Sequence, residues 1–114
     1  MTIFFDMDGV LADFDRGLRE LCHFTPLPVN EPRTQAFEEA MWTEIRAVPH
    51  FYGQLHPMPG AIEMFRQIHN TGVPCEILTG IPKPRRKITA AGEDKVDWVR
   101  RYLSEDTVTH IVMK

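Results

Sequence analysis

The chain has 114 residues, of which 43% are hydrophobic and 25% charged, a composition typical of one folded domain with a modest core. Its net charge of -3 argues against a protein that wraps a nucleic-acid polymer. No apolar stretch approaches the roughly 20 residues that cross a bilayer, and the first residues lack a signal-peptide pattern. We therefore expect a cytoplasmic protein with no membrane partner, in which Cys22 and Cys75 are reduced thiols.

Hydrophobic periodicity predicts strands alternating with helices. The apolar run at residues 2–5 predicts a buried strand, and residues 13–23 follow with apolar positions at helical spacing. After a proline-rich loop, Thr34 is placed to cap a helix that runs to residue 48. The remaining predicted elements are a helix from Pro59 to the stop signal at 70–72, a strand at 74–78, a loop at 81–92, a helix at 93–103 and a strand at 107–113.

Polar side chains stand where two of these strands end. The alternation of strands and helices predicts an α/β fold with a parallel sheet. Asp6 and Asp8 follow the first strand, and Thr79 follows the second. Because ligands of such sheets bind beyond the carboxyl ends of the strands, we expect these three side chains to share a site.

Asp6 and Asp8 are two carboxylates at the end of a buried strand, followed by Gly9, which permits a sharp turn. Removing both charges from water is costly, and a hard divalent cation such as Mg²⁺ would compensate for that cost. A carboxylate beside a metal ion can attack phosphorus, and a second can protonate the leaving oxygen. The alternative is a solvated turn, because this tetrapeptide is common.

Several short stretches, in order over nearly the whole chain, carry a family pattern. They are IFFDMDGVLAD at 3–13, FY at 51–52, PMPGA at 57–61, ILTG at 77–80 and GEDKVDWV at 92–99. These stretches resemble the haloacid-dehalogenase-like (HAD) phosphatases, and among those the 5'(3')-deoxyribonucleotidases. The resemblance implies a Rossmann-like three-layer parallel sheet, with a core at 1–13 and 58–114 and a small helical cap inserted at 14–57.

The resemblance implies a role for each matching residue. Asp6 would be the nucleophile that forms an aspartyl-phosphate, and Asp8 the general acid and base. The Asp6 side chain and the Asp8 backbone carbonyl would hold Mg²⁺. The Thr79 hydroxyl and the Gly80 amide would bind phosphoryl oxygens, although many relatives carry serine at the Gly80 position. Lys95 would steady the charge of the nucleophile and of the phosphate.

Lys95 also stands out on physical grounds. It falls in the first turn of the helix predicted at 93–103, where a cation opposes the helix dipole. We infer that another interaction holds it there. The alternative is a surface lysine paired with Glu93 or Asp94.

Aromatic residues of the cap are candidate contacts for the base of a nucleoside monophosphate, the small phosphorylated substrate that the resemblance implies. We assign this role to Phe14, Phe51 and Tyr52, with burial in the core as the alternative. Trp42 is a further candidate, but it lies at helical spacing with Ile45, so we interpret it as a core residue and keep base contact as the alternative.

The loop at 81–92 contains four cations close to the strand that carries Thr79, namely Lys83, Arg85, Arg86 and Lys87. Arg85 and Arg86 are assigned to substrate binding, because a local positive potential attracts a phosphorylated molecule. The alternative is a loop that only keeps the surface soluble.

The family pattern includes a later strand ending in an acidic pair that completes the Mg²⁺ shell, and no such pair follows the strand at 107–113. We therefore expect a chain truncated relative to the family, with an open edge on the first strand. An open apolar edge invites pairing, which predicts a homo-oligomer or an exchanged strand. Three functions remain: an active nucleotidase-like phosphatase, a phosphatase for another small phosphate ester, or a catalytically impaired protein that only binds a nucleotide or phosphate.

Overall fold

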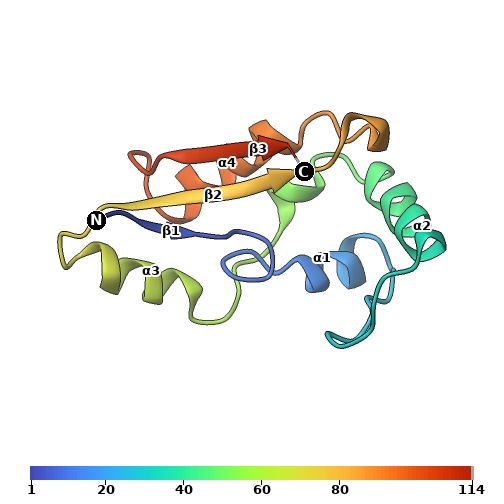
Figure 1. Ribbon diagram of the computed structural model, residues 1–114, viewed down its shortest axis with the longest axis horizontal. Helices are drawn as coiled ribbons and strands as arrows, with labels where there is room; N and C mark the ends of the chain where they lie inside the picture. Colours follow the sequence, from blue (N-terminus) through green and yellow to red (C-terminus); the bar gives the residue numbers. More distant parts are fainter. Residues whose placement is uncertain (114) are drawn as a thin grey trace.

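The computed structural model describes residues 1–113, which form a small parallel sheet and a set of helices (Figure 1). In chain order the elements are β1 (Ile3–Phe5), α1 (Phe14–Leu21), α2 (Gln35–Arg46), the 3-10 turn η1 (Phe51–Gln54), α3 (Ala61–His69), β2 (Cys75–Ile81), the 3-10 turn η2 (Pro84–Arg86), α4 (Ala91–Tyr102) and β3 (Thr109–Met113). The predicted α/β class and the predicted order of elements are confirmed.

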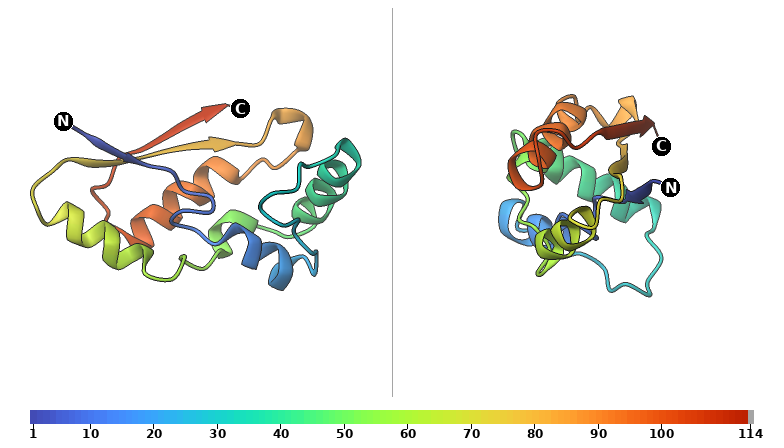
Figure 2. Two further views of the ribbon diagram at one scale, coloured as in Figure 1. Left: turned by 60° about the horizontal axis from the view of Figure 1, so that its bottom comes forward. Right: turned by 90° about the vertical axis from the view of Figure 1, so that its left-hand side faces the viewer.

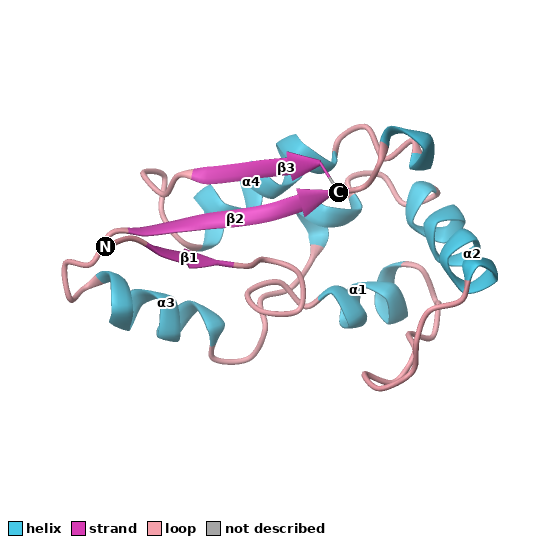
Figure 3. Ribbon diagram, in the orientation of Figure 1, coloured by secondary structure: helices cyan, strands magenta, loops and turns pink. Residues whose placement is uncertain are grey.

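The sheet has the strand order β1-β2-β3, and both pairs are parallel. Phe5 lies opposite Ile77, and Thr79 lies opposite Ile111. The carboxyl ends of the strands therefore point to the same edge, where α2 and the loop with η2 lie (Figure 3). Among the described residues β1 pairs only with β2, so its outer edge is open, and the homo-oligomer expected from that edge stays a prediction.

The helices cover one face of the sheet, and residues 1–113 provide no layer over the other face (Figure 2). On the covered face Phe5, Ile77 and Thr79 are buried. On the open face Phe4, Leu78 and Val112 are 53%, 44% and 46% exposed. The expectation of three layers is therefore wrong for this part of the chain, which has two.

Local signals explain where the helices of the insert begin. Thr34 accepts a hydrogen bond from the backbone N–H of Phe37 at 3.1 Å and caps α2 as predicted. Asp13 caps α1 in the same way through the N–H of Arg16, also at 3.1 Å. α1 ends at Leu21, two residues before the predicted end at residue 23.

Two element boundaries near the cationic loop predicted at 81–92 differ from the prediction. β2 continues through Gly80 to Ile81, because it pairs with β3 up to the contact between Ile81 and Met113. α4 begins at Ala91 and not at residue 93. Lys95 is therefore the fifth residue of α4, beyond the first turn, where the helix dipole has little effect. The dipole argument made from the sequence is wrong, and another cause must explain the position of Lys95.

Hydrophobic packing joins residues 14–57 to the sheet and its helices. Trp98 of α4 is fully buried, and its indole N–H donates to the backbone carbonyl of Leu55 at 2.8 Å, which ties the segment after η1 to α4. Cys22 and Cys75 are free and buried, and burial raises the pKa of the Cys22 thiol. Within residues 1–113, none of the helices combines the length and the apolar character that a membrane crossing requires.

Candidate active site

The loop after β1 folds back on itself and fixes the two carboxylates. The carbonyl of Met7 accepts hydrogen bonds from the N–H groups of Leu11 and Ala12, both at 2.9 Å, and the N–H of Gly9 donates to Ala12 at 2.8 Å. Gly9 has a φ of 77°, a left-handed value that a residue with a Cβ rarely adopts. The Met7 side chain is fully buried, which leaves Asp6 exposed before it and Asp8 half-buried after it.

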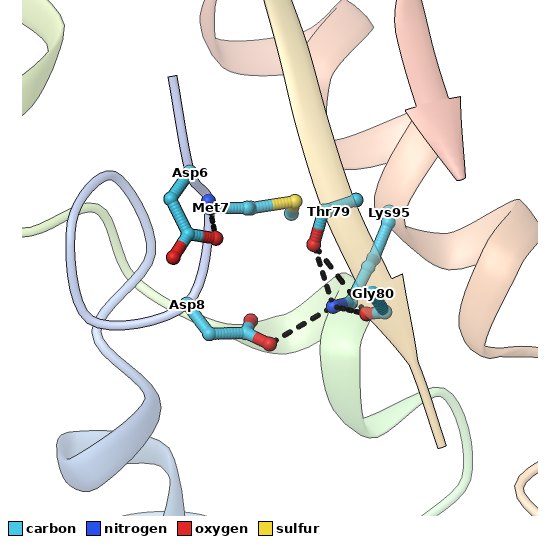
Figure 4. A network of polar contacts seen from close by, with 6 residues as sticks. All are labelled: Asp6, Met7, Asp8, Thr79, Gly80 and Lys95. Carbon is cyan, nitrogen blue, oxygen red and sulfur yellow. Dashed lines mark hydrogen bonds and ion pairs between the residues drawn. The ribbon is translucent and has the colours of Figure 1, made fainter. Parts of the chain in front are cut away.

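Lys95 links this loop to the end of β2. Its ammonium group donates to a carboxylate oxygen of Asp8 at 2.9 Å, to the hydroxyl of Thr79 at 2.9 Å and to the backbone carbonyl of Gly80 at 2.6 Å (Figure 4). The Lys95 side chain is 0% exposed. These contacts explain why a lysine is buried at this position, and they exclude the alternative of a surface lysine paired with Glu93 or Asp94.

The carboxylates differ in their surroundings. One oxygen of Asp6 accepts from the N–H of Met7 at 2.7 Å, so this carboxylate turns back toward its own loop (Figure 4). The Oδ1 atom of Asp8 is buried without a hydrogen-bond partner among the described residues. Such an orphaned anionic oxygen is costly, and a cation or a hydrogen-bond donor of a ligand would satisfy it.

The oxygen atoms in the loop after β1 could hold Mg²⁺ if water and a substrate phosphate supply the remaining ligands. Among residues 1–113 no group of three or more acidic, histidine or cysteine side chains is arranged to hold a metal ion. Mg²⁺ commonly binds through one or two carboxylates, retains several waters and takes further oxygens from a substrate phosphate. The Asp6 carboxylate and the backbone carbonyl of Asp8, in the same loop, would meet that smaller requirement.

A cavity of about 140 Å³ opens beside Asp8. It is lined by Asp8, Phe14, Arg33, Trp42, Tyr52, Gly80, Ile81 and Pro82. We call it the aromatic cavity, because three of these side chains are aromatic. The lining combines one carboxylate, that of Asp8, with mostly apolar residues. This combination suits a small molecule with a charged group at one end and a flat ring behind it.

Tyr52 connects the aromatic cavity to Lys95. The ammonium of Lys95 lies 4.5 Å from the centre of the Tyr52 ring, within the range of a cation–π contact. Tyr52 is 2% exposed, and burial, followed by the charge of Asp8, raises the pKa of its hydroxyl far above the ordinary value. The hydroxyl is therefore neutral at physiological pH and can act as a hydrogen-bond donor.

The structure brings together most of the residues singled out in the sequence. Asp8, Thr79, Gly80 and Lys95 form one hydrogen-bonded network, with Asp6 in the same loop as Asp8 (Figure 4). The other candidates lie around it as follows: Phe14 and Tyr52 line the aromatic cavity, Arg85 and Arg86 line a neighbouring cavity, and Phe51 lies outside both, 1% exposed, with its ring packed against those of Phe14 and Tyr52.

Two lining residues were not assigned to the site from the sequence. Trp42, interpreted as core, is half-buried and lines the aromatic cavity. Arg33 precedes the cap residue of α2 and also lines the cavity. Glu38 holds both, since one of its oxygens accepts from the Trp42 indole at 2.9 Å and the other lies 3.5 Å from the Arg33 guanidinium. The sequence offered one weak indication of this role: Arg33 immediately precedes the capped helix that carries Trp42.

Comparison with known proteins finds distant relatives that are named 5'(3')-deoxyribonucleotidases. No family model matches the chain. The chain is 27% identical over 99% of its length to a protein of Bordetella pertussis that is provisionally named 5'(3')-deoxyribonucleotidase. It is 26% identical, again over 99% of its length, to the human 5'(3')-deoxyribonucleotidase of cytosolic type. It spans 66% of the bacterial protein and 63% of the human one, just under two thirds of each. The similarity supports the resemblance seen in the motifs.

Proposed function

We propose that the chain carries the active site of a Mg²⁺-dependent phosphomonoester hydrolase that acts on nucleoside or deoxynucleoside monophosphates. One observation carries this proposal: a fully buried lysine joins Thr79 to Asp8 and Gly80, and the last two line the aromatic cavity. A buried cation beside a hydroxyl and a carboxylate is suited to receive a phosphate. The names of the distant relatives support a nucleotide as the phosphate carrier.

In the proposed reaction Asp6 and Asp8 have separate roles. An oxygen of Asp6 attacks phosphorus, the bond from phosphorus to the leaving oxygen breaks, and Asp8 gives that oxygen a proton. Water then attacks the phosphorus of the aspartyl-phosphate and loses a proton to Asp8. Inorganic phosphate is released, and the Asp6 carboxylate is restored.

The neighbours of Asp8 support these steps. When the phosphate enters, the ammonium of Lys95 can exchange its contact with Asp8 for the phosphoryl oxygens, beside the Thr79 hydroxyl. Asp8, next to a phosphate dianion and relieved of the lysine, can then carry the proton that it transfers. The Asp6 side chain and the Asp8 carbonyl would hold Mg²⁺, which supplies positive charge against the phosphoryl oxygens.

Phosphate release from a panel of nucleoside monophosphates tests the proposal, with Mg²⁺ and with EDTA. We expect release that requires Mg²⁺, that is lost in Asp6→Asn, and that is retained in Asp106→Asn, an exposed aspartate outside the site. If the folded wild-type chain releases no more phosphate than Asp6→Asn, the hydrolase proposal fails. The chain would then be a protein that at most binds a nucleotide or phosphate.

A further inference from the structure

A second cavity, of about 400 Å³, adjoins the aromatic cavity, and Asp8 does not line it. It is lined by Arg33, Gln35, Glu38, Trp42, Pro82, Lys83, Arg85 and Arg86. We call it the basic cavity. Arg33, Trp42 and Pro82 line both cavities, so the two are adjacent. A ligand that fills the aromatic cavity and extends past these three residues would reach the basic cavity.

The basic cavity concentrates positive charge in a chain that is negative overall. Its lining contains four cations and one carboxylate, whereas the whole chain has a net charge of -3. Within residues 1–113, Arg33 has an acidic partner, Glu38, but Lys83, Arg85 and Arg86 have no carboxylate within 4.0 Å. Gathering like charges is unfavourable unless an anion offsets them. The charge of the lining therefore matches an anionic ligand.

The two sides of the basic cavity come from distant parts of the chain and hold each other in place. The guanidinium of Arg86, in η2, lies 6.0 Å from the centre of the Trp42 ring on α2. Arg46, also on α2, donates to the backbone carbonyl of Arg86 at 2.9 Å. Glu38 fixes the Trp42 indole from the other side. These contacts form the cavity before any ligand binds, which lowers the entropic cost of binding.

We propose that the basic cavity binds a second phosphate of the substrate, so that bisphosphorylated nucleosides bind better than monophosphates. This inference rests on the proposed function, which places the reacting phosphate at Asp8 and Lys95. The ring or sugar of the nucleoside lies in the aromatic cavity, and the second phosphate contacts Lys83 and Arg85. Arginine binds phosphate through two parallel hydrogen bonds, and lysine adds a point charge.

Isothermal titration calorimetry with thymidine 5'-monophosphate and thymidine 3',5'-bisphosphate tests the inference. Both ligands are titrated into the Asp6→Asn chain, in which the loss of the proposed nucleophile prevents hydrolysis during the measurement. We expect the bisphosphate to bind about tenfold more tightly, the combined effect of two charge-assisted contacts that are open to solvent. This advantage falls as the salt concentration rises, because the cavity is open to solvent.

Substitutions of single cations at residues 83–87 show whether the basic cavity is a phosphate-binding site or only a positively charged surface. Lys83→Gln and Arg85→Gln should each remove most of the advantage of the bisphosphate, and Lys83→Gln should leave the affinity for the monophosphate unchanged. Lys87→Gln removes the same charge from the same loop, but Lys87 does not line the basic cavity, so the advantage should persist. Equal affinities for the two ligands, or an equal loss in all three variants, would overturn the inference. Because binding is measured without turnover, the phosphate-release assay judges the hydrolase proposal separately.

Discussion

Replacing Lys95 by methionine isolates the energetic role of the buried ammonium. Methionine fits the apolar length of the site but removes hydrogen bonds to Asp8, Thr79 and Gly80. Removing one partner of a buried ion pair costs about 3–5 kcal/mol, because the other charge is left unpaired. The Asp8 side chain is 25% exposed, so water recovers part of that cost. We expect a loss of about 2–3 kcal/mol in the free energy of unfolding.

Urea denaturation measures this loss, followed by the fluorescence of the fully buried Trp98. A loss of that size also lowers the melting temperature by roughly 10–15 °C for a domain of this length. Lys87→Met is the matched control, since Lys87 is exposed and its ammonium makes no ion pair within residues 1–113. Its unfolding free energy should change by less than about 0.5 kcal/mol.

A double-mutant cycle with Asp8→Asn identifies the source of the cost. If the unpaired carboxylate causes it, Lys95→Met should cost less in the Asp8→Asn background, with a coupling energy of about 1–3 kcal/mol. Two results would refute this reasoning: additive effects of the two substitutions, or a Lys95→Met chain as stable as the wild type. Either would mean that the contact between Lys95 and Asp8 contributes little to the folded state.

Two further predictions concern packing and titration. A Cβ added at Gly17 would lie 2.3 Å from a methyl carbon of Leu55, so Gly17→Ala should lower the unfolding free energy by about 1 kcal/mol in urea denaturation, although alanine favours helix. Gly92→Ala, where nothing lies within 4 Å of the added carbon, is the control and should not destabilise. The pKa of Tyr52 is raised by burial, so the folded chain retains a proton that the unfolded chain loses above about pH 10. Stability should therefore fall with rising pH above that value, by up to about 1.4 kcal/mol per pH unit more in the wild type than in Tyr52→Phe, and equal slopes would contradict the assignment.

Local sequence signals were sufficient for most elements of the fold. The cap at Thr34 and the apolar run before Asp6 are properties of short segments, and both elements form where they were predicted. The expectation that the first strand is buried is wrong, because only Phe5 of β1 is buried and Phe4 is 53% exposed. The end of β2 could not be predicted from such local signals. The sequence predicted that the strand ends before Thr79 and Gly80, but pairing with β3 extends β2 to Ile81. Such pairing depends on residues far away in the chain.

The candidate site, like the fold, was predictable where it depends on short segments and not where it depends on contacts between distant residues. Asp6, Asp8 and Thr79 could be placed together because the ends of parallel strands meet at one edge. The contact between Lys95 and Asp8 joins residues 87 apart in sequence, and only packing of α4 against the sheet produces it. Trp42 shows the limit of periodicity, which identifies the face of α2 that packs inward but not how deeply. At the edge of that face, Trp42 contacts the core and also lines the aromatic cavity.

The alternation of side chains along β2 assigns the two faces of the sheet to different roles. Thr79 points to the face covered by helices, where the buried ammonium of Lys95 reaches its hydroxyl at 2.9 Å. Leu78, one residue earlier, points to the open face and is 44% exposed beside Phe4 and Val112. A polar substitution at Leu78 should therefore leave the network of Lys95 intact, because the strand backbone separates the two side chains. The proposed chemistry and the open face thus lie on opposite sides of the same three strands.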